Sequence, residues 1–388
     1  MVAGLDTPHP TPHTTEQDRL CRLRLIRSRR VGPATYHRLV AEHGSAQAAL
    51  EALPEIARAG GIEGYEPCPE AVALAEMRAA RAVGARMLCA GDRHYPDALR
   101  QIADAPPILW LRGRPELLLS PMVGVVGARN ASSLGLRMAR RLAAALGEAG
   151  FTVVSGLARG IDAEAHVASL ATGTVAVVAG GVDRVYPAEN GPLMARMAET
   201  GCLVSEQPPG LEPQARHFPL RNRIISGLSR ALVVVEAAAR SGSLLTAREA
   251  AEQGREVFAV PGHPFDARAA GCNLLIREGA TLVRAASDVL EALGMQGVRA
   301  EGPLAVPDLP GQDLPEPGLP GPVPPRRPLR DLAALHRLIL DRLAPSPLAE
   351  DQLIRDLALP SDDVTPELLA LEMEGALVRQ PGGLLARA

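Results

Sequence analysis

The 388-residue sequence contains no lysine, so arginine supplies all 41 basic side chains. Aromatic residues make up only 2% of the chain, and its five cysteines form no C-x-x-C pair. Without lysine, a Walker A phosphate loop is excluded. Scattered, odd-numbered cysteines argue against a zinc site and indicate the reduced thiols of a cytoplasmic protein. No apolar run approaches the roughly 18 residues that a membrane-spanning helix needs, so no membrane segment is predicted.

Composition divides the chain into five segments. Residues 1–18 contain three prolines and no apolar signal-peptide core, which predicts a disordered tail. Residues 19–88 have the pattern of a helical domain, and residues 89–295 alternate between strand and helix patterns. Ten prolines in residues 296–328 predict an extended linker. Residues 329–388 then form a small C-terminal domain.

The N-terminal segment contains a helix, a Gly-Pro turn and a second helix. Leu20, Leu23 and Ile26 share one face of the first helix, and Gly32-Pro33 ends the helical pattern. This arrangement resembles a helix-hairpin-helix or sterile-alpha-motif-like unit. Its turn either packs against the rest of the domain or offers backbone N–H groups to a phosphate.

The middle segment alternates short apolar runs with helical patterns. Such runs are typical of parallel strands that are buried on both faces of a sheet. The expected strands cover residues 122–126, 151–154, 175–179, 202–204, 231–235, 257–260 and 281–283. The pattern predicts a Rossmann-like, doubly wound α/β fold with a mainly parallel sheet, in which ligands bind beyond the carboxyl ends of the strands.

Glycine and serine follow several of these strand ends. Each glycine lets the backbone approach a ligand, and each helix N-terminus offers unpaired N–H groups. The turns predicted to bind an anion contain Gly127, Ser155, Gly156, Gly160, Ser241, Gly242 and Ser243. Together they favour a phosphate-bearing ligand over merely tight loops. The dinucleotide pattern G-x-G-x-x-G is absent, which disfavours NAD.

Arginines accompany the same turns. Arg129 and Arg159 lie within two of them, and a further group surrounds the start of a helix: Arg216, Phe218, Arg221, Asn222 and Arg223. Arginines beside backbone N–H groups suit consecutive phosphates of a nucleic-acid strand, and a phenylalanine ring suits a base. The alternative is that Arg221 and Arg223 are ion-paired with acids at the sheet edge, such as Glu206 and Glu236.

Asp162 and His166 are four residues apart and therefore share a helix face. They have the spacing of an acid–base pair or of two metal ligands, but no third histidine or cysteine ligand is evident. We expect both side chains to hydrogen-bond the Gly-rich loop and support it. No nucleophile stands beside a partner base, so neither a catalytic group, a metal nor a cofactor is predicted.

The middle of the chain resembles the DNA-processing protein A family, also called DprA or Smf, over about residues 90–295. The resemblance rests on motifs in a fixed order: Val126–Arg129, Ser155–Asp162 with His166, Tyr186-Pro187, Ser205-Glu206, Phe218–Arg223, Val235-Glu236, Ser241–Thr246 and Val260–Gly262. It implies a non-catalytic, cytoplasmic homodimer that binds single-stranded DNA through its Rossmann-like domain. It also implies that the protein protects incoming DNA and loads the RecA recombinase in natural transformation (competence) and recombination.

The resemblance also implies which residues of this sequence contact DNA. It implies contacts at Arg129, in the loop 155–162 and in the run 218–223. Some family members have a lysine just before the phenylalanine of that run, and here Arg216 supplies the charge.

Residues 329–388 resemble the winged-helix domain that family members often carry. Its third helix is predicted to open at Thr365 and Pro366, and it bears Glu367, Glu372 and Glu374 but no arginine. The segment 328–388 has 6 arginines and 10 acidic residues, a net charge of −4. Because such a helix repels phosphates, the domain is predicted to contact protein or to regulate, rather than to recognise DNA.

An enzyme is the alternative function. Nucleotide phosphoribohydrolases of the lysine-decarboxylase-like group have similar strand-end loops, with a Pro-Gly-Gly-x-Gly-Thr motif and a catalytic glutamate. The corresponding segment here is Ser241–Thr246, and Ala250 stands where a carboxylate would serve. That departure favours binding over hydrolysis. A third alternative is that the Rossmann-like domain is only a scaffold and that the N- and C-terminal domains carry the function.

Overall fold

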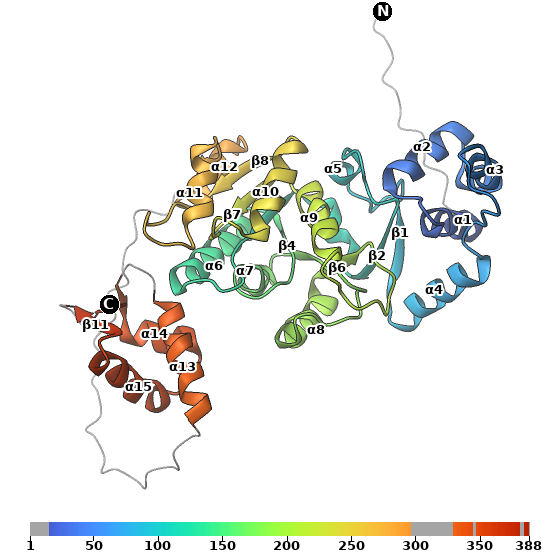
Figure 1. Cartoon of the computed structure of the whole chain (residues 1–388). Coiled ribbons are helices and arrows are strands. Elements are labelled where there is room, and N and C mark those ends of the chain that lie inside the picture. Colours follow the sequence, from blue (N-terminus) through green and yellow to red (C-terminus); the bar gives the residue numbers. More distant parts are fainter. Residues whose placement is uncertain (1–14, 296–328, 344–346, 381–383, 388) are drawn as a thin grey trace, which may run out of the picture. The chain divides into compact units, whose positions relative to one another are not determined.

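The computed structural model describes residues 15–295, 329–343, 347–380 and 384–387. These residues form two units, each described here by itself: one holds the N-terminal helices and a large sheet, the other the C-terminal domain. The N-terminal helices are α1 (Glu16–Arg27), α2 (Pro33–His43), α3 (Ala46–Ala59) and α4 (Glu70–Ala82) (Figure 1). None of the helices within the described ranges combines the length and apolarity needed to cross a bilayer.

A nine-stranded sheet forms the centre of the first unit. Its strands are β1 (Arg86–Cys89), β2 (Ile108–Gly113), β3 (Met122–Val126), β4 (Thr152–Ser155), β5 (Thr174–Val177), β6 (Cys202–Ser205), β7 (Ala231–Val234), β8 (Glu256–Ala259) and β9 (Thr281–Leu282). All seven predicted strands are present and mutually parallel. Two further strands were not predicted: β1 pairs antiparallel with β2, and β2 pairs antiparallel with β6.

The strand order is β1-β2-β6-β5-β4-β3-β7-β8-β9. From β3 the chain adds β4, β5 and β6 on one side, and it then returns to add β7, β8 and β9 on the other side. The order therefore reverses between β3 and β7. At such a switch point the loops beyond the carboxyl ends of two neighbouring strands diverge and leave a crevice.

Helices cover both faces of the sheet, as a doubly wound fold requires. They are α5 (Asp97–Arg100), α6 (Ser133–Glu148), α7 (Ile161–Ser169), α8 (Gly191–Thr200), α9 (His217–Leu228), α10 (Gly242–Glu252) and α11 (Ala270–Arg277), with the 3₁₀ turns η1 (Pro115–Leu119) and η2 (Ala188–Asn190). The helix α12 (Ala286–Ala292) belongs to the second unit. The predicted Rossmann-like fold is confirmed.

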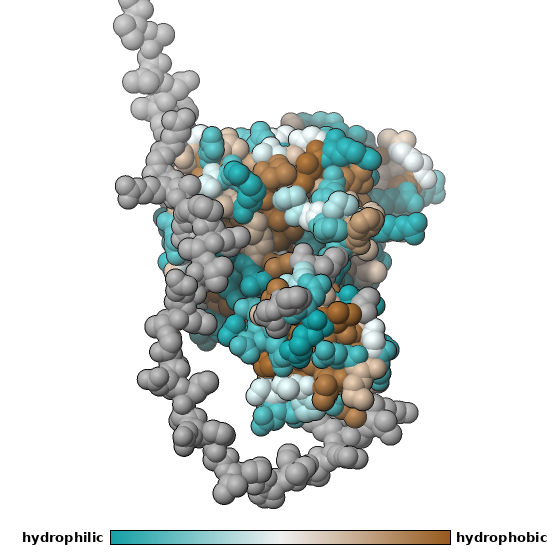
Figure 2. All heavy atoms as spheres, turned by 90° about the vertical axis from the view of Figure 1, so that its left-hand side faces the viewer, coloured by the Kyte–Doolittle hydropathy of each residue, from teal (hydrophilic) through white to brown (hydrophobic). Residues whose placement is uncertain are grey.

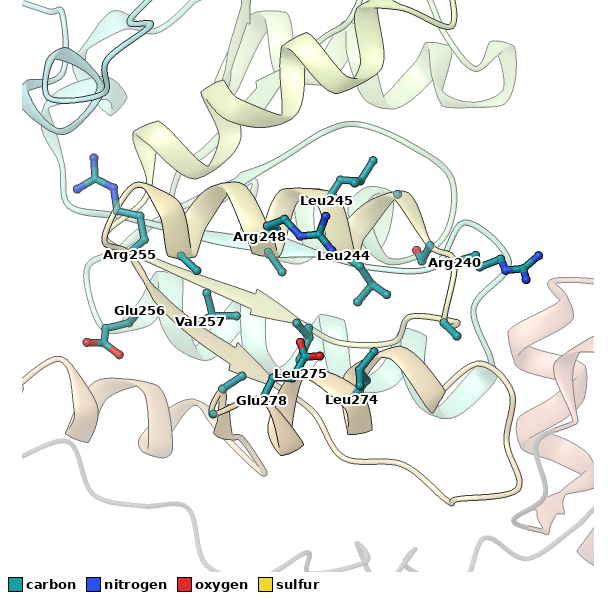
Figure 3. Close-up of a pocket in the computed structure, with 17 residues that line it drawn as sticks. Arg240, Leu244, Leu245, Arg248, Arg255, Glu256, Val257, Leu274, Leu275 and Glu278 are labelled. Carbon is teal, nitrogen blue, oxygen red and sulfur yellow. The ribbon is translucent and has the colours of Figure 1, made fainter.

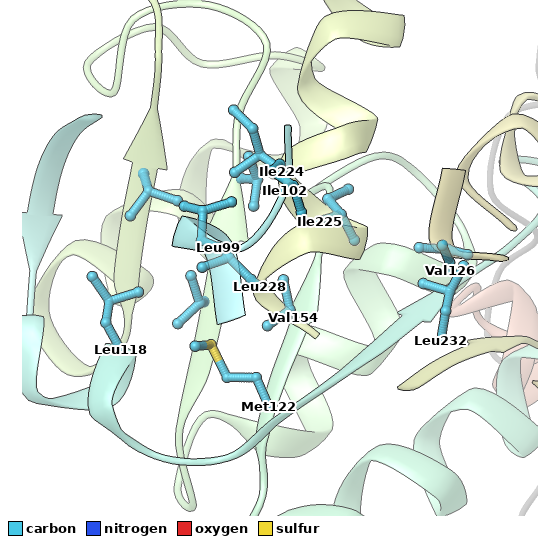
Figure 4. Packing of buried hydrophobic residues seen from close by; sticks show 14 of the residues in the cluster. Leu99, Ile102, Leu118, Met122, Val126, Val154, Ile224, Ile225, Leu228 and Leu232 are labelled. Carbon is cyan, nitrogen blue, oxygen red and sulfur yellow. The ribbon is translucent and has the colours of Figure 1, made fainter. Parts of the chain in front are cut away.

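Alternate residues of the strands supply two separate cores. Along β2, Leu109 and Leu111 join the cluster that includes α9 and α10, whereas Ile108 and Trp110 join the cluster that includes α1, α4 and α8. This is the period of two that sends successive strand side chains to opposite faces. In the first cluster, Ile224 and Leu228 of α9 lie against residues from the strands (Figure 4).

The N-terminal helices share a core with the sheet. Leu20 and Leu23 of α1 belong to the same buried cluster as Trp110 of β2. The indole Nε1 of Trp110 donates to Glu76 Oε1 at 2.9 Å, and Arg27 pairs with the same carboxylate at 2.8 Å. The opposite side of α1 packs with α2 and α3 in a second cluster. The helical segment therefore does not form a free-standing bundle.

The C-terminal unit has the fold of a winged helix. It contains α13 (Leu329–Arg342), β10 (Leu348–Ala349), α14 (Glu350–Leu357), α15 (Ser361–Met373), β11 (Leu377–Gln380) and β12 (Leu384–Arg387), with the strands in the order β10-β12-β11. The predicted start of the third helix is wrong. The helix α15 begins at Ser361, four residues before Thr365, because Asp362 and Asp363 in its first turn favour an N-terminus there.

The outer side of α15 is partly apolar. Leu369 and Met373 are four residues apart, which places them on one face, and they are 58% and 83% exposed. Figure 2 shows hydrophobic surface among hydrophilic surface on this domain. Of the acids near these side chains, Glu374 at the C-cap is exposed, whereas Glu372 is half-buried and pairs with Arg379 at 3.5 Å.

Candidate nucleic-acid interface

A pocket of about 670 Å³ opens at the switch point between β3 and β7. The loops that follow these two strands form part of its wall, together with the first turns of α9 and α10. The predicted site residues that line it are Gly127, Arg129, Asp162, Phe218, Arg221, Asn222, Ser241, Gly242 and Ser243. Residues from four separate segments of the sequence therefore meet in one concave site.

Other predicted residues lie outside this pocket. Ser155 is fully buried, and its hydroxyl donates to the Val125 carbonyl at 2.6 Å. Arg159 is exposed and forms an ion pair with Glu189 at 3.3 Å. Arg216 is exposed at the N-terminus of α9.

Gly160 joins the loops that follow β3 and β4. Its φ of +73° lies in the region that favours glycine, and a Cβ there would come within 2.3 Å of the Ala128 carbonyl oxygen. The Ile161 N–H donates to the same carbonyl at 3.2 Å. The two loops are therefore in direct backbone contact.

The loop after β4 is held from two sides. The Asp162 carboxylate accepts the N–H groups of Gly156 at 3.1 Å and Ala158 at 3.4 Å. The Asn190 side-chain amide donates to the carbonyls of Leu157 at 2.9 Å and Ala158 at 3.2 Å. Burial raises the pKa of Asp162, although the charge of Arg221 and these N–H groups oppose the rise. Asp162 therefore holds the loop through hydrogen bonds.

The prediction that His166 also hydrogen-bonds this loop is wrong. Its Nδ1 lies 2.7 Å from the Thr174 hydroxyl, at the start of β5, because the ring is one helical turn farther from the loop than Asp162. Burial and the charge of Arg221 lower the pKa of His166 to about 3. The ring is therefore neutral at physiological pH and belongs to the packing of α7 on the sheet.

Arg221 lies at the base of the pocket. The residue is 7% exposed, and its guanidinium packs directly on Gly156, where a Cβ would fall 1.4 Å from Nη1. Burial lowers the pKa of Arg221 to about 10, with Asp162 raising it and Arg129 lowering it further. The side chain therefore remains charged at neutral pH. Its Nε has no hydrogen-bond partner in the described part of the chain, which leaves a buried cation incompletely satisfied.

Arg129 and two aromatic rings stand beside Arg221. The Arg129 guanidinium lies 5.2 Å from the centre of the Phe218 ring, a cation–π distance. The Phe218 ring is 5.5 Å from the ring of Tyr186, which follows β5. A cation and an aromatic face are thus presented together, which suits a phosphate and the base attached to it.

Arg223 differs from Arg221. It does not line the pocket but is buried, and its Nη2 donates to both carboxylate oxygens of Glu206 at 2.8 Å. Its Nε also pairs with Asp104 at 3.1 Å. For Arg223 the structure shows the ion pair that was the alternative to a ligand contact.

Sequence reasoning missed several residues of the site. Asn130, Arg240 and Arg268 line the pocket, and Asn190 holds its loop. Arg268 pairs with Asp266 at 3.1 Å and with Glu236 at 3.7 Å. Asn130 and Arg240 directly adjoin the predicted Arg129 and Ser241. Asn190 and Arg268 lie outside the Gly-rich and Phe-Pro patterns, and the order of the strands brings them to this edge.

A second pocket, of about 680 Å³, adjoins the first. It lies between α10 and α11 and is lined mainly by aliphatic side chains, among them Leu244, Val257 and Leu274 (Figure 3). The two pockets share Arg240, Ser241, Gly242 and Leu245. Within the described ranges, no group of three or more potential ligands is placed to hold a metal ion.

Glu249 on α10 faces the Arg223 ion pairs and makes the stability of the protein depend on pH. Burial raises its pKa to about 7, with Arg223 opposing and with Asp104 and Glu252 adding to the rise. A raised carboxyl pKa means that the folded state disfavours the charged form. This group therefore destabilises the fold increasingly as pH rises from about 4.5, the ordinary value, through 7.

We expect Glu249→Gln to raise the urea midpoint of unfolding at about pH 8 relative to the wild type, and to leave it nearly unchanged at about pH 4.5. The amide keeps the shape of the carboxyl group but carries no charge at either pH. Glu252→Gln, three residues along the same helix and exposed, is the comparison and should show a much smaller difference, since its charge is the smallest of the contributions that raise the pKa of Glu249. A wild-type and a Glu249→Gln midpoint that move in parallel with pH would contradict the assignment.

The fold and the site define a class: a Rossmann-like protein with a cationic, aromatic pocket at its switch point, preceded by helices and followed by a winged helix. The chain matches the family model described as DNA recombination-mediator protein A over residues 86–294. It also matches the DprA-like N-terminal HHH domain over residues 16–79 and the DprA winged helix domain over residues 323–383. The chain belongs to the DprA/Smf family.

Individual relatives agree with this assignment. The chain is 38% identical over 316 residues to Protein Smf of Synechocystis, covering 76% of this chain and 79% of that one. It is 43% identical over 230 residues to the DNA processing protein DprA of Bacillus subtilis, covering 58% and 77%.

Two solved structures are similar to the chain. The X-ray structure of DprA from Streptococcus pneumoniae matches with a TM-score of 0.55 and 34% identity, covering 72% of this chain and 94% of that one. A structure of DprA from Helicobacter pylori matches with a TM-score of 0.50 and 26% identity, covering 54% and 95%, and its description concerns single-stranded DNA binding.

Proposed function

We propose that this protein binds single-stranded DNA in the pocket between β3 and β7, without catalysis. The observation that carries the proposal is the lining of this pocket, where the charged side chains of Arg129 and Arg221 meet beside the ring of Phe218. The two positive charges would attract a phosphate into the pocket, and the exposed guanidinium of Arg129 is free to donate hydrogen bonds to it. The Gly127 turn and Gly242, the first residue of α10, bring backbone close to the ligand as well, whereas the N–H groups of Ser241 and Ser243 are bonded to Ala238 and to the Ser241 hydroxyl.

The distribution of aromatic rings supports a single-stranded ligand. All nine aromatic residues lie in the described part of the chain, and six of them are buried: Tyr36, Tyr65, Tyr95, Trp110, Phe151 and Phe258. Tyr186 and Phe218 are among the remaining three, and both stand at the carboxyl edge of the sheet beside the arginines. A ring can stack on a base only when the base is unpaired and turned outward, which favours single strands over duplex.

The geometry favours binding over hydrolysis of a nucleotide. Asp162 supplies the carboxylate among the described residues that line the pocket, and its Oδ2 accepts two N–H groups of the loop. Ala250, at the position where a glutamate would serve, is fully buried in the core. Neither residue is placed to activate water, so the phosphoribohydrolase alternative has less support.

The family supplies the wider role that we propose. Relatives are named DNA processing proteins, and the resemblance supports protection of incoming single-stranded DNA and loading of RecA in transformation and recombination. It likewise supports a cytoplasmic homodimer formed through the Rossmann-like domain. For the winged helix we propose contact with protein, because the exposed side of α15 presents the apolar side chains of Leu369 and Met373.

The experiment that tests the proposal measures binding of a single strand and of its duplex across a range of salt concentrations. We expect tighter binding of the single strand. We also expect the logarithm of its affinity to fall by about 2 per tenfold rise in salt, since each of about three neutralised phosphates contributes roughly 0.7. Fluorescence anisotropy with labelled oligonucleotides provides the affinities. Equal affinity for duplex, or an affinity independent of salt, would contradict the proposal.

A further inference from the structure

Phe265 is an apolar ring that lies almost entirely in solvent. It is 90% exposed, whereas no other large apolar side chain described in residues 15–295 exceeds the 58% of Leu119. It is also the third of the three aromatic residues outside the cores, with Tyr186 and Phe218. In a chain with so few rings, each of these three follows the carboxyl end of a parallel strand.

The loop that carries Phe265 contributes to the pocket wall. It connects β8 to α11, so it leaves the same edge of the parallel sheet as the loops after β3 and β7. Arg268 of this loop lines the pocket. Three residues of chain span at most about 11 Å, so the backbone of Phe265 lies within that distance of the backbone of Arg268.

The loop is held in place by side chains of α11 and of the loop itself. The Asn273 amide bonds both backbone groups of Gly262, at 3.2 Å and 3.1 Å. Asp266 accepts the backbone N–H of Arg268 at 3.0 Å and its guanidinium Nε at 3.1 Å. The Phe265 N–H donates to His263 Nδ1 at 3.3 Å, and the two rings are 5.6 Å apart. A ring presented on an ordered backbone loses little entropy when it binds a ligand.

We propose that Phe265, with His263 beside it, is an outer stacking platform for a base of the single strand whose phosphates occupy the Arg129–Arg221 pocket. The proposal rests on the proposed function, which it extends by a second point of contact. The strand leaves the pocket past Arg268, and the next accessible base lies on the ring of Phe265. Stacking on an aromatic face tolerates any base, which suits a protein that receives strands of any sequence.

Tryptophan fluorescence tests the contact directly. The native chain has one tryptophan, and Trp110 is 2% exposed and hydrogen-bonded to Glu76, so its emission is a constant background. We expect the emission of a Phe265→Trp variant to be quenched by oligothymidylate, with the midpoint of quenching equal to that of binding. Leu119→Trp is the matched control, since Leu119 is exposed next to the amino end of β3, at the opposite edge of the sheet. Its emission should not change.

Oligonucleotide length separates the platform from the pocket. We expect Phe265→Ala to weaken binding of a strand of about 20 nucleotides roughly tenfold, and to leave a strand of about 4 nucleotides unaffected, since the shorter strand fills only the pocket. Phe265→Leu should behave like alanine, because it keeps the apolar bulk and loses the aromatic face. The native side chain is exposed, so unfolding of these variants is not expected.

The outcomes distinguish the two proposals. If the wild type binds single strands while the emission of the Phe265→Trp variant stays constant and Phe265→Ala binds both lengths normally, the platform is overturned and the pocket stands. If the emission of the Phe265→Trp variant shifts with protein concentration and DNA adds nothing, a second copy of the chain covers the ring and the platform is again wrong. If the wild type binds no single strand, the proposed function itself fails.

Discussion

The Glu206→Ala variant is expected to lose about 3 kcal/mol of unfolding free energy, the low end of what breaking a buried ion pair costs. The guanidinium of Arg223 is buried, and Glu206 accepts two hydrogen bonds from it. Alanine removes both acceptors and leaves the cation in the interior, with Asp104 as its remaining partner. Urea denaturation at neutral pH measures the loss.

The matched control for Glu206 is Glu189→Ala. Glu189 also pairs with an arginine, Arg159, but both partners are more than half exposed, so the loss should stay below about 1 kcal/mol. Replacing Glu206 and Arg223 together by leucine and methionine should restore part of the stability, since no unpaired charge is then buried. A loss at Glu206 no larger than at Glu189 would show that Arg223 does not depend on this partner.

The Arg129→Ala variant is expected to weaken single-stranded DNA binding by about 1–3 kcal/mol, or roughly 5- to 150-fold, while the fold stays intact. Arg129 is exposed at the mouth of the pocket, and in the described part of the chain it makes no ion pair with an acid. Its removal therefore takes a charge from the ligand without leaving a buried group unpaired. Binding by anisotropy and melting temperature should be measured together.

Arg196→Ala is the control for Arg129. Arg196 is an exposed arginine of α8 that does not line the pocket, so the substitution removes the same charge from elsewhere on the surface. Its effect on affinity should be within about twofold at physiological salt, since exposed charges beyond a Debye length are screened. Equal losses for the two variants would mean that only net charge matters. A collapse in melting temperature for Arg129→Ala would give it a structural role instead.

Local patterns predict the parallel strands because each follows a short apolar run, and β3 to β7 are buried on both faces. The strands β1 and β2 were not predicted from the sequence. They pair antiparallel at one edge of the sheet and lie outside the regular alternation of strands and helices, although Ile108–Leu111 is itself an apolar run. The position of the pocket depends on the order of the strands, which no periodicity contains. Asn190 and Arg268 are therefore part of the site for reasons visible only once β3 and β7 lie side by side.

The roles of the two arginines of α9 also could not be predicted from the sequence. Arg221 and Arg223 are two residues apart, so about 200° of helix rotation separates them. Arg221 faces Gly156 and the pocket, whereas Arg223 faces Glu206 and Asp104. The sequence supports both a ligand contact and an ion pair for each residue. The orientation of α9 on the sheet decides that Arg221 lines the pocket and that Arg223 forms the ion pair.

The hydrogen bond from Trp110 to Glu76 has a consequence for how fragments of this protein are cut. The family model for the central domain begins at Arg86, yet Leu20 and Leu23 of α1 cover the same face of the sheet as Trp110. A fragment that starts at that boundary would leave an indole N–H without its acceptor and an apolar face in water. An expression fragment of the central domain should therefore begin before α1, so that it contains the N-terminal helices together with the sheet.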